Sequence, residues 1–254
     1  MKNMVQLITY VDRLTGGCIK DLNELLGGPF NGIFGGVHIL PFFYAYDGSD
    51  TGFDPIDHTQ IDPRLGVWED VKAISEHTEV IADLIVNHIS SSSEQYKDWL
   101  EKSDQSDYAD MFITLDKVFP KGANTKTLLG IYRPRPNLPF TVVTRKDFSK
   151  EIVWTTFTPQ QIDIDVEHPL GRTYLSQVMK IFSENGVKML RLDAIGYAIK
   201  RAGTSCFMIP ETFQYIDDLT CEAKSLGMEV LVEVHSYYKT QIQIAKHVDW
   251  VYDF

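Results

Sequence analysis

The 254-residue chain contains only three cysteines, Cys18, Cys206 and Cys221, and they are scattered along the sequence. An odd and scattered set provides neither a disulfide framework nor closely spaced metal ligands. Such cysteine usage is typical of proteins in a reducing compartment. We therefore expect a cytoplasmic protein.

Basic clusters and long apolar runs are also missing. The formal net charge is −11, and no run of Lys and Arg exceeds two residues. We therefore expect neither a nucleic acid nor a membrane as partner. No apolar run approaches the ~18 residues that span a bilayer. The N-terminal stretch has no small-residue cleavage site, so it indicates a first strand and not a signal peptide.

Short apolar segments alternate with segments of helical periodicity. The sequence predicts strands at residues 5–10, 36–43, 79–88, 187–196, 228–235 and 250–254. It predicts helices at residues 19–27, 67–78, 174–186 and 210–226. Strands that alternate with helices form a parallel sheet with right-handed crossovers, and nearly continuous apolar strands are covered on both faces.

The length and the alternation favour an α/β fold of the (β/α)8 TIM-barrel type. The six strands are two fewer than a closed barrel needs, so we expect a barrel truncated at about the sixth strand. Strands one to three would occupy residues 1–89, a small inserted domain residues 90–165, and strands four to six residues 166–254, before barrel closure. An open sheet is the alternative, but no Gly-rich phosphate loop follows the first strand.

Polar side chains are concentrated where the predicted strands end, which is where barrel enzymes place their active sites. Asn87 and His88 end the third strand, and Arg191 and Asp193 end the fourth. Glu233 and His235 end the fifth, and the loop after the second carries Asp50, Asp54, Asp57 and His58.

Residues two apart share one face of a strand, so Arg191 and Asp193 lie together, as do Glu233 and His235. A lone Asp beside an Arg is usually a structural ion pair. Two carboxylates at adjacent strand ends instead suggest glycosyl transfer, where ~5 Å separation gives a retaining mechanism.

The surroundings of the two carboxyls predict different roles. Arg191 should lower the pKa of Asp193 and keep it ionised, as a nucleophile requires. Glu233 follows Leu231 and Val232 and has no adjacent cation in sequence. Burial would keep Glu233 protonated, as a general acid requires.

The segments RLDAIGYA, LVEVH, DLIVNH and GFDPIDH resemble the α-amylase superfamily of retaining glycoside hydrolases and transferases. The similarity is greater to its branch of sucrose phosphorylases, through IYRPRPNLPFT, WTTFTPQQIDID, KRAGTSCFM and VEVHSYY. The resemblance covers essentially the whole chain. It implies glucosyl transfer from sucrose to phosphate, giving α-D-glucose 1-phosphate and fructose through a covalent glucosyl-enzyme.

The resemblance also implies roles for individual residues. Asp193 would be the nucleophile and Glu233 the acid/base. Asp50, His88 and Arg191 would hold the glucosyl unit between Phe53 and Phe157, while Gln161 and His235 would lie on the acceptor side. Tyr197 and the loop from Tyr132 to Arg135 would lie close to the site. The third acidic residue of the family would follow the sixth strand, beyond Phe254.

Phosphate must enter a pocket that already holds carboxylates, so a nearby cation is needed. Arg135, in a loop stiffened by proline, is our candidate, because a guanidinium grips phosphate bidentately. Alternatively, Arg133 and Arg135 anchor the inserted domain.

We expect no cofactor and no metal, although Asn87 occupies the position of a calcium ligand in some amylases. Cys206 is expected to pack as a small apolar residue and not to act as a nucleophile.

Several alternatives remain open. The donor could instead be sucrose 6′-phosphate, glucosylglycerol or glucosylglycerate, or the enzyme could be a sucrose hydrolase. A non-catalytic sugar-binding barrel and an inactive fragment are alternatives of a different class. The expected partners are small molecules, sucrose and phosphate, and a homodimer is compatible with the sequence.

Overall fold

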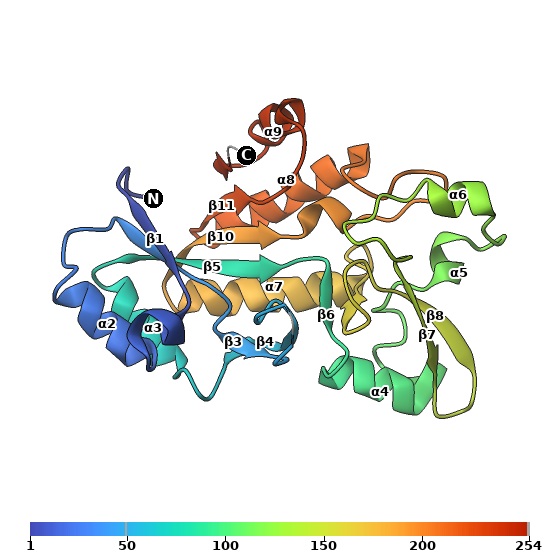
Figure 1. Cartoon of the computed structure of the whole chain (residues 1–254), viewed down its shortest axis with the longest axis horizontal. Helices are drawn as coiled ribbons and strands as arrows, with labels where there is room; N and C mark the ends of the chain where they lie inside the picture. Colours follow the sequence, from blue (N-terminus) through green and yellow to red (C-terminus); the bar gives the residue numbers. More distant parts are fainter. Residues whose placement is uncertain (49, 253–254) are drawn as a thin grey trace.

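The computed structural model describes residues 1–48 and 50–252. Within them, six parallel strands form one open sheet in the order β1-β2-β5-β10-β11-β12 (Figure 1). Their bounds are Gln6–Thr9, Gly36–Ile39, Glu79–Ile85, Val187–Asp193, Glu229–Val232 and Trp250–Val251. The predicted parallel sheet is confirmed, and it corresponds to the strands of a barrel that has not closed. The last predicted strand extends to residues 253–254, which lie outside the described part.

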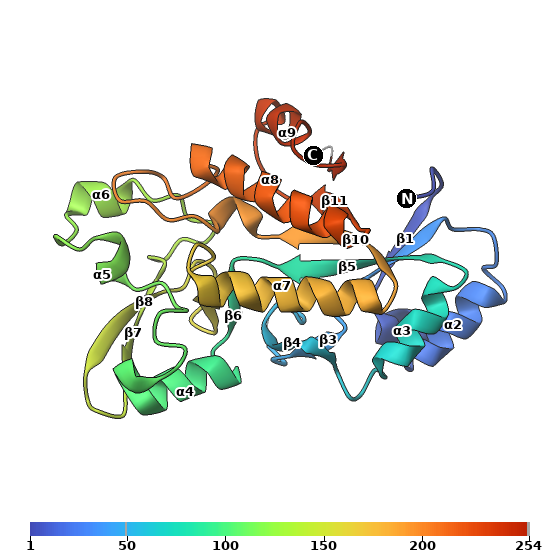
Figure 2. The same ribbon diagram turned by 180° about the vertical axis from the view of Figure 1, so that it is seen from behind.

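Helices cover the outer face of this sheet. Figure 2 shows α7 and α8 lying across it, and α2 and α3 pack together beside its first strands. These helices run over Ile19–Gly27 (α2), Trp68–Ser75 (α3), Pro169–Glu184 (α7) and Pro210–Ser225 (α8). Two shorter helices, α1 (Val11–Thr15) and α9 (Tyr238–Ile244), follow β1 and β11.

Helix α7 shows how the sequence sets these elements. Pro169 occupies the first turn, where its missing N–H costs nothing, and the His168 side chain accepts from the Leu170 N–H. One face is buried, at Tyr174, Leu175, Val178, Met179 and Phe182, with the spacing of an amphipathic helix. Gly186 then takes a left-handed φ of 85°, which ends the helix and turns the chain into β10.

Four of the predicted strands have wrong boundaries. The strand predicted at residues 187–196 ends at Asp193. The segment 36–43 splits, because Pro41 has no N–H for a ladder; β3 (Phe43–Ala45) then pairs antiparallel with β4 (Pro55–Ile61). Asp57 and His58 therefore lie in β4 and not in a loop. The segment 79–88 also splits, since His88 begins a separate strand, β6 (His88–Ser90). Strand β11 ends at Val232, so Glu233 and His235 follow it.

The segment between β6 and α7 forms a group of small elements at one end of the sheet (Figure 1, right). It contains α4 (Glu94–Lys102), η1 (Ser103–Gln105), α5 (Leu115–Val118), α6 (Thr125–Leu129), β7 (Phe140–Thr144), β8 (Lys150–Trp154) and β9 (Gln161–Asp163). Strands β7 and β8 form a hairpin, and β9 pairs with β6. Its status as an inserted domain remains a prediction.

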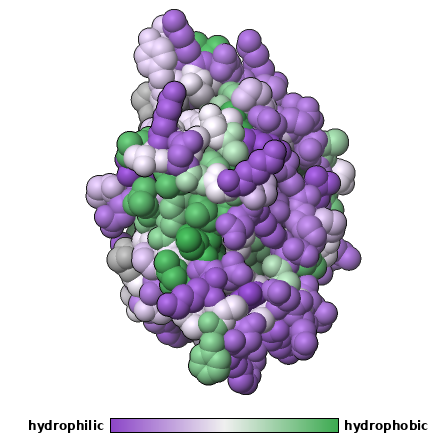
Figure 3. Space-filling model, turned by 90° about the vertical axis from the view of Figure 1, so that its right-hand side faces the viewer, coloured by the Kyte–Doolittle hydropathy of each residue, from purple (hydrophilic) through white to green (hydrophobic). Residues whose placement is uncertain are grey.

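The surface at this end is mostly hydrophilic. Figure 3 faces it and shows hydrophobic side chains gathered in one patch among polar ones. Part of the segment has its own small core, in which Cys206 is buried beside Ile113, Phe119, Ile131 and Trp154. No helix among the described residues is both long enough and apolar enough to cross a membrane.

The close approach of α7 to α3 at Gly186 gives a test of the packing. A Cβ on Gly186 would lie 2.1 Å from Ser75 Oγ, whereas one on Gly203, which also has a positive φ, meets nothing within 4 Å. Gly186→Ala and Gly203→Ala share a backbone strain of roughly 1–2 kcal/mol. Overpacking should cost Gly186→Ala about 1–3 kcal/mol more in urea unfolding. Equal losses of unfolding free energy in Gly186→Ala and Gly203→Ala would show that Ser75 on α3 shifts without cost and would contradict tight packing at Gly186.

Candidate active site

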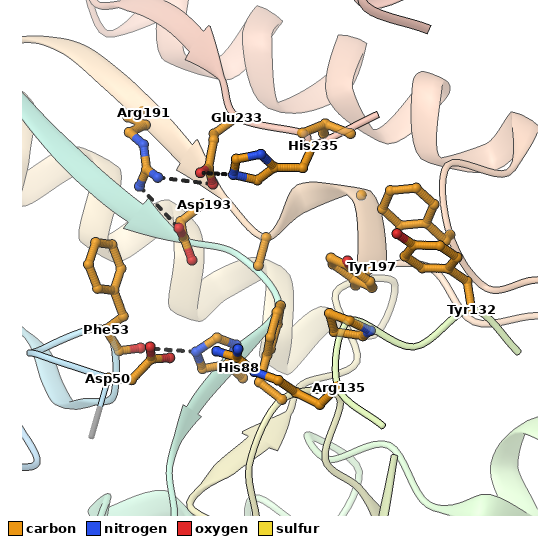
Figure 4. Close-up of a pocket in the computed structure, with 16 residues that line it drawn as sticks. Asp50, Phe53, His88, Tyr132, Arg135, Arg191, Asp193, Tyr197, Glu233 and His235 are labelled. Atoms are coloured by element: carbon orange, nitrogen blue, oxygen red, sulfur yellow. Dashed lines mark hydrogen bonds and ion pairs between the residues drawn. The ribbon is translucent and has the colours of Figure 1, made fainter. Parts of the chain in front are cut away.

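A cavity of about 480 Å³ opens at the carboxyl ends of β5, β10 and β11 (Figure 4). Among the predicted site residues, Asp50, Phe53, His88, Arg135, Phe157, Arg191, Asp193, Tyr197, Glu233 and His235 line it. Gln161 lies behind Asp50, and its Nε2 donates to Asp50 Oδ2 at 2.6 Å. The structure therefore brings together residues that lie nearly 200 positions apart in the sequence.

The Arg191 guanidinium is the centre of the site. Its Nη1 lies 2.7 Å from Asp83 Oδ1 and 3.0 Å from Asp193 Oδ1, and its Nη2 lies 2.9 Å from Glu233 Oε2. The parallel register explains this arrangement, because Arg191 is level with Asp83 on β5 and with Leu231 on β11. Alternate residues share a face, so all four polar side chains point to the inside of the curved sheet.

The expected electrostatics of the two carboxyls need correction. Glu233 has no cation beside it in sequence, but the fold brings Arg191 into contact with it. Burial raises the pKa of Asp193, Arg191 lowers it, and the charges of Asp83 and Glu233 raise it; the net value is about 7. Arg191 thus favours the anion as predicted, but burial outweighs it.

Glu233 lies directly after β11, where the ladder continues through its N–H to the Leu192 carbonyl. Its Oε1 is 3.0 Å from His235 Nε2, so its two oxygens are held by different residues (Figure 4). Asp193 is followed by Ala194 in the left-handed region, with φ of 55°. Such strain in a non-glycine residue is characteristic of functional sites; here it turns the chain into η2 (Ile195–Tyr197).

The opposite wall of the cavity carries Asp50, Phe53 and His88. His88 is buried, with Nε2 2.9 Å from the Phe53 carbonyl and its ring against Phe157 at 5.4 Å. Burial lowers the pKa of His88, so its imidazole is neutral and donates to that carbonyl. The ring of Phe53 lies 5.6 Å from the Arg191 guanidinium carbon. This wall can therefore offer both an aromatic surface and hydrogen bonds to a hydroxylated ligand.

Aromatic rings also line the outer part of the cavity. Tyr132 stacks on Phe207 with centroids 4.3 Å apart, and Tyr197 packs on Phe207 at 4.7 Å and on Phe157 at 5.1 Å. Phe207 was not among the predicted site residues. Its signal was the single aromatic in AGTSCFM, which alone does not separate a site residue from a core residue.

The two arginines of the proline-containing loop take different places. Arg135 is exposed and lines the cavity. Arg133 does not line this cavity; it lines a neighbouring hollow with Leu129 and Ser205, which Arg135 also borders. Arg135 is therefore the arginine that faces the carboxylates.

Among the buried ionic residues, Asp83 and the ion pair of Lys200 with Asp163 were missed from the sequence. Lys200 Nζ lies 2.6 Å from Asp163 Oδ2 and donates to Asn87 Oδ1 at 2.7 Å. The side-chain oxygen of Asn87 is therefore a hydrogen-bond acceptor for a lysine. A buried charge between apolar residues, as in ADLIV, was the available signal for Asp83. The described residues contain no group of three or more His, Cys, Asp or Glu placed to hold a metal ion.

Comparisons with known proteins show the family and the fold of the chain. Residues 32–246 match the model of the alpha amylase catalytic domain. The whole chain is 56% identical to a sucrose phosphorylase of Agrobacterium vitis and 52% identical to one of Bifidobacterium adolescentis, over 52% and 50% of those proteins. The crystal structure of sucrose 6F-phosphate phosphorylase from Thermoanaerobacter thermosaccharolyticum superposes on the whole chain with a TM-score of 0.93 and 43% identity, over 52% of that protein. The chain thus spans about half the length of these relatives.

The raised pKa of Asp193 predicts a stability that depends on pH. A carboxyl with a folded pKa of about 7 and an ordinary value of 3.8 binds its proton more tightly in the folded state. Its contribution is therefore greatest at low pH and is lost as pH rises from about 4 to about 7. Asp193→Asn does not titrate, so its advantage in unfolding free energy over the wild type should grow by roughly 3 kcal/mol between pH 5 and pH 8. A gap that stays constant with pH would contradict the buried Asp193 described here.

Proposed function

The chain belongs to the α-amylase family, and we propose that the enzyme of which it forms part is a sucrose phosphorylase. The observation that carries this proposal is a pair of carboxyls, Asp193 and Glu233, held by one guanidinium at the base of a sugar-sized cavity. Arg135, which is exposed, also lines this cavity. The relatives named sucrose phosphorylase support the choice of substrate.

In the first step, Asp193 attacks the anomeric carbon of the glucosyl unit and the bond to the fructosyl oxygen breaks. Glu233 gives its proton to that oxygen, so fructose leaves as a neutral alcohol. The product is a covalent β-glucosyl ester of Asp193. Only the ionised form of Asp193 can attack, and Arg191 supports that form against the burial that opposes it.

In the second step, an oxygen of hydrogen phosphate attacks the same carbon and Asp193 leaves as a carboxylate. Glu233 takes the phosphate proton and so regains its acid form. Two inversions give retention, and the product is α-D-glucose 1-phosphate. Arg135 would bind the incoming phosphate and offset the charge of the carboxylates around it. Tyr197, beside Arg135 on the cavity wall, would contribute its hydroxyl to the same anion.

The remaining roles follow the positions of the side chains. Asp50 and His88 would bind glucosyl hydroxyls, with Phe53 and Phe157 as the aromatic walls. Gln161 reaches the cavity through its hydrogen bond to Asp50, and His235 lies on the open side, next to Glu233. We also propose that residues 90–165 are an inserted domain that delivers Arg135, Phe157 and Gln161, and that the enzyme is cytoplasmic, in line with its cysteine usage.

A second candidate donor is sucrose 6F-phosphate, on which the structural relative with TM-score 0.93 acts. An assay of the complete gene product with sucrose and with sucrose 6F-phosphate, which follows glucose 1-phosphate, distinguishes the two donors. Formation of glucose 1-phosphate from sucrose that requires phosphate supports the first proposal. Release of free glucose with no phosphate dependence would contradict a phosphorylase.

The acid and nucleophile roles predict different responses to the leaving group. Glu233→Gln should lower kcat/KM for sucrose by about 10²–10⁴-fold, because fructose then leaves without a proton. With α-D-glucosyl fluoride, whose leaving group needs no proton, Glu233→Gln should lose far less. Asp193→Asn should lose activity on both donors. Equal losses of Glu233→Gln on both donors would contradict its role as the acid.

The phosphate role of Arg135 is tested against its neighbour Arg133. Removing a charge-assisted bidentate contact costs roughly 1.5–3 kcal/mol, so Arg135→Ala should raise the KM for phosphate by about 10–100-fold. Sucrose hydrolysis without phosphate should hardly change. Arg133→Ala is the matched control, and an equal rise in its KM would assign both arginines to anchoring the loop.

A further inference from the structure

The ionic network of the site continues into the layer beneath the cavity. His38 on β2 is only 2% exposed, and its Nε2 lies 3.1 Å from Asp83 Oδ1. Asp83 is fully buried, and the same oxygen accepts from Arg191 Nη1 at 2.7 Å. Above them lie Asp193 and Glu233, so a continuous set of contacts joins His38 to both carboxyls.

The parallel register places these groups on three neighbouring strands. His38 is level with Ile81, and Asp83, two residues further along β5, is level with Arg191. Residues two apart share a face, so His38, Asp83 and Arg191 all point into the curved side of the sheet. His38 is one step lower than Asp83 and reaches it diagonally.

The chemistry of the contacts assigns the donors. An ionised carboxylate can only accept hydrogen bonds, so His38 Nε2 donates to Asp83. The His38 and Arg191 contacts lower the pKa of Asp83 despite its burial, which keeps it ionised. Arg191 Nη1 is shared between Asp83 and Asp193, at 2.7 and 3.0 Å. Because His38 donates a hydrogen bond to Asp83, Asp83 competes less with Asp193 for Arg191 Nη1.

We propose that His38 is a positioning residue for glucosyl transfer, which holds Asp83 and thereby keeps Arg191 directed at Asp193 and Glu233. The inference rests on the proposed function, since it deepens the account of the same site. His38 itself does not line the cavity that holds Asp193 and Glu233. Its effect passes through two other residues.

The surroundings of His38 make this contact strong. A second cavity of about 240 Å³ borders it, with Ile81, Met189 and Leu231 among its walls. Its other titratable groups are the N-terminal ammonium of Met1, Lys2 and Tyr252, and Tyr252 also forms a hydrogen bond with Arg191. A mostly apolar wall weakens solvent screening of the His38–Asp83 pair. On the other side, His58 Nε2 contacts the Asp83 backbone carbonyl at 3.1 Å. Burial lowers the pKa of His58 to about 4, so His58 anchors β5 without adding charge.

The test compares His38→Leu, His38→Gln and Asp83→Asn in the complete gene product. The control is His77→Leu, because His77 is exposed and contacts Asn23 and Thr78 away from the site. Two readouts are measured against pH: kcat/KM for glucosyl transfer from sucrose, and the rate at which a carbodiimide labels Asp193, followed by peptide mass spectrometry. Carbodiimides react with protonated carboxyls, so the second readout follows Asp193 without requiring activity.

The expected shifts have opposite signs. In His38→Leu, Arg191 shifts toward Asp83 and stabilises the Asp193 anion less. The midpoints of the two pH profiles, for kcat/KM and for labelling of Asp193, should therefore both rise by about half a pH unit or more. In Asp83→Asn, the negative charge of Asp83, which raises the pKa of Asp193, is removed, and Arg191 no longer pairs with it. Both midpoints should therefore fall. A Gln amide can replace the imidazole N–H, so His38→Gln should remain near the wild type, as should His77→Leu.

Three outcomes would overturn the inference. They are unmoved midpoints in His38→Leu, a His38→Gln shift as large as that of His38→Leu, and shifts of the same sign in Asp83→Asn and His38→Leu. If His38→Leu does not fold, His38→Met, another apolar replacement without an N–H donor, takes its place, and the same upward shift is expected of it. If the wild type transfers no glucosyl unit, the proposed function fails, and the labelling midpoints alone judge the role of His38.

Discussion

The shared guanidinium of Arg191 is the interaction on which the rest of the site depends. It touches Asp83, Asp193 and Glu233, three carboxyls that would otherwise repel one another in a partly dehydrated space. Arginine suits this place because it stays charged and its planar head offers several donors in fixed directions. Without that charge, burial would leave Asp193 protonated near neutral pH, and a protonated carboxyl is a poor nucleophile.

The fold supplies this arrangement through the parallel sheet. Parallel strands end at the same edge, so side chains from β5, β10 and β11 meet there although they are far apart in sequence. The segment between β6 and α7 closes the cavity from the other side. It adds Arg135, Phe157 and, through Asp50, Gln161. The two carboxyls thus lie at the end of the sheet, and much of the rest of the cavity wall comes from the loop between β3 and β4 and from the segment between β6 and α7.

Much of the architecture could be predicted, because burial leaves a periodic pattern in the sequence. Helix α2 was predicted with its observed bounds of residues 19–27, and the six strands of the sheet were all found. The predicted boundaries failed where the chain leaves the sheet. Pro41 and the turn before His88 split two strands, since ladder pairing with distant segments decides where a strand ends and local pattern does not.

The sequence by itself determined which residues could do chemistry: Asp193, Glu233 and their neighbours are polar groups at the ends of apolar strands. It also determined their faces, since alternation along a strand is a local property. Only the tertiary structure decided their charge states, because those depend on burial and on partners brought from other strands. Asp83 and His38 had no visible link to the site in the sequence; the parallel register places Asp83 level with Arg191 and His38 one step lower.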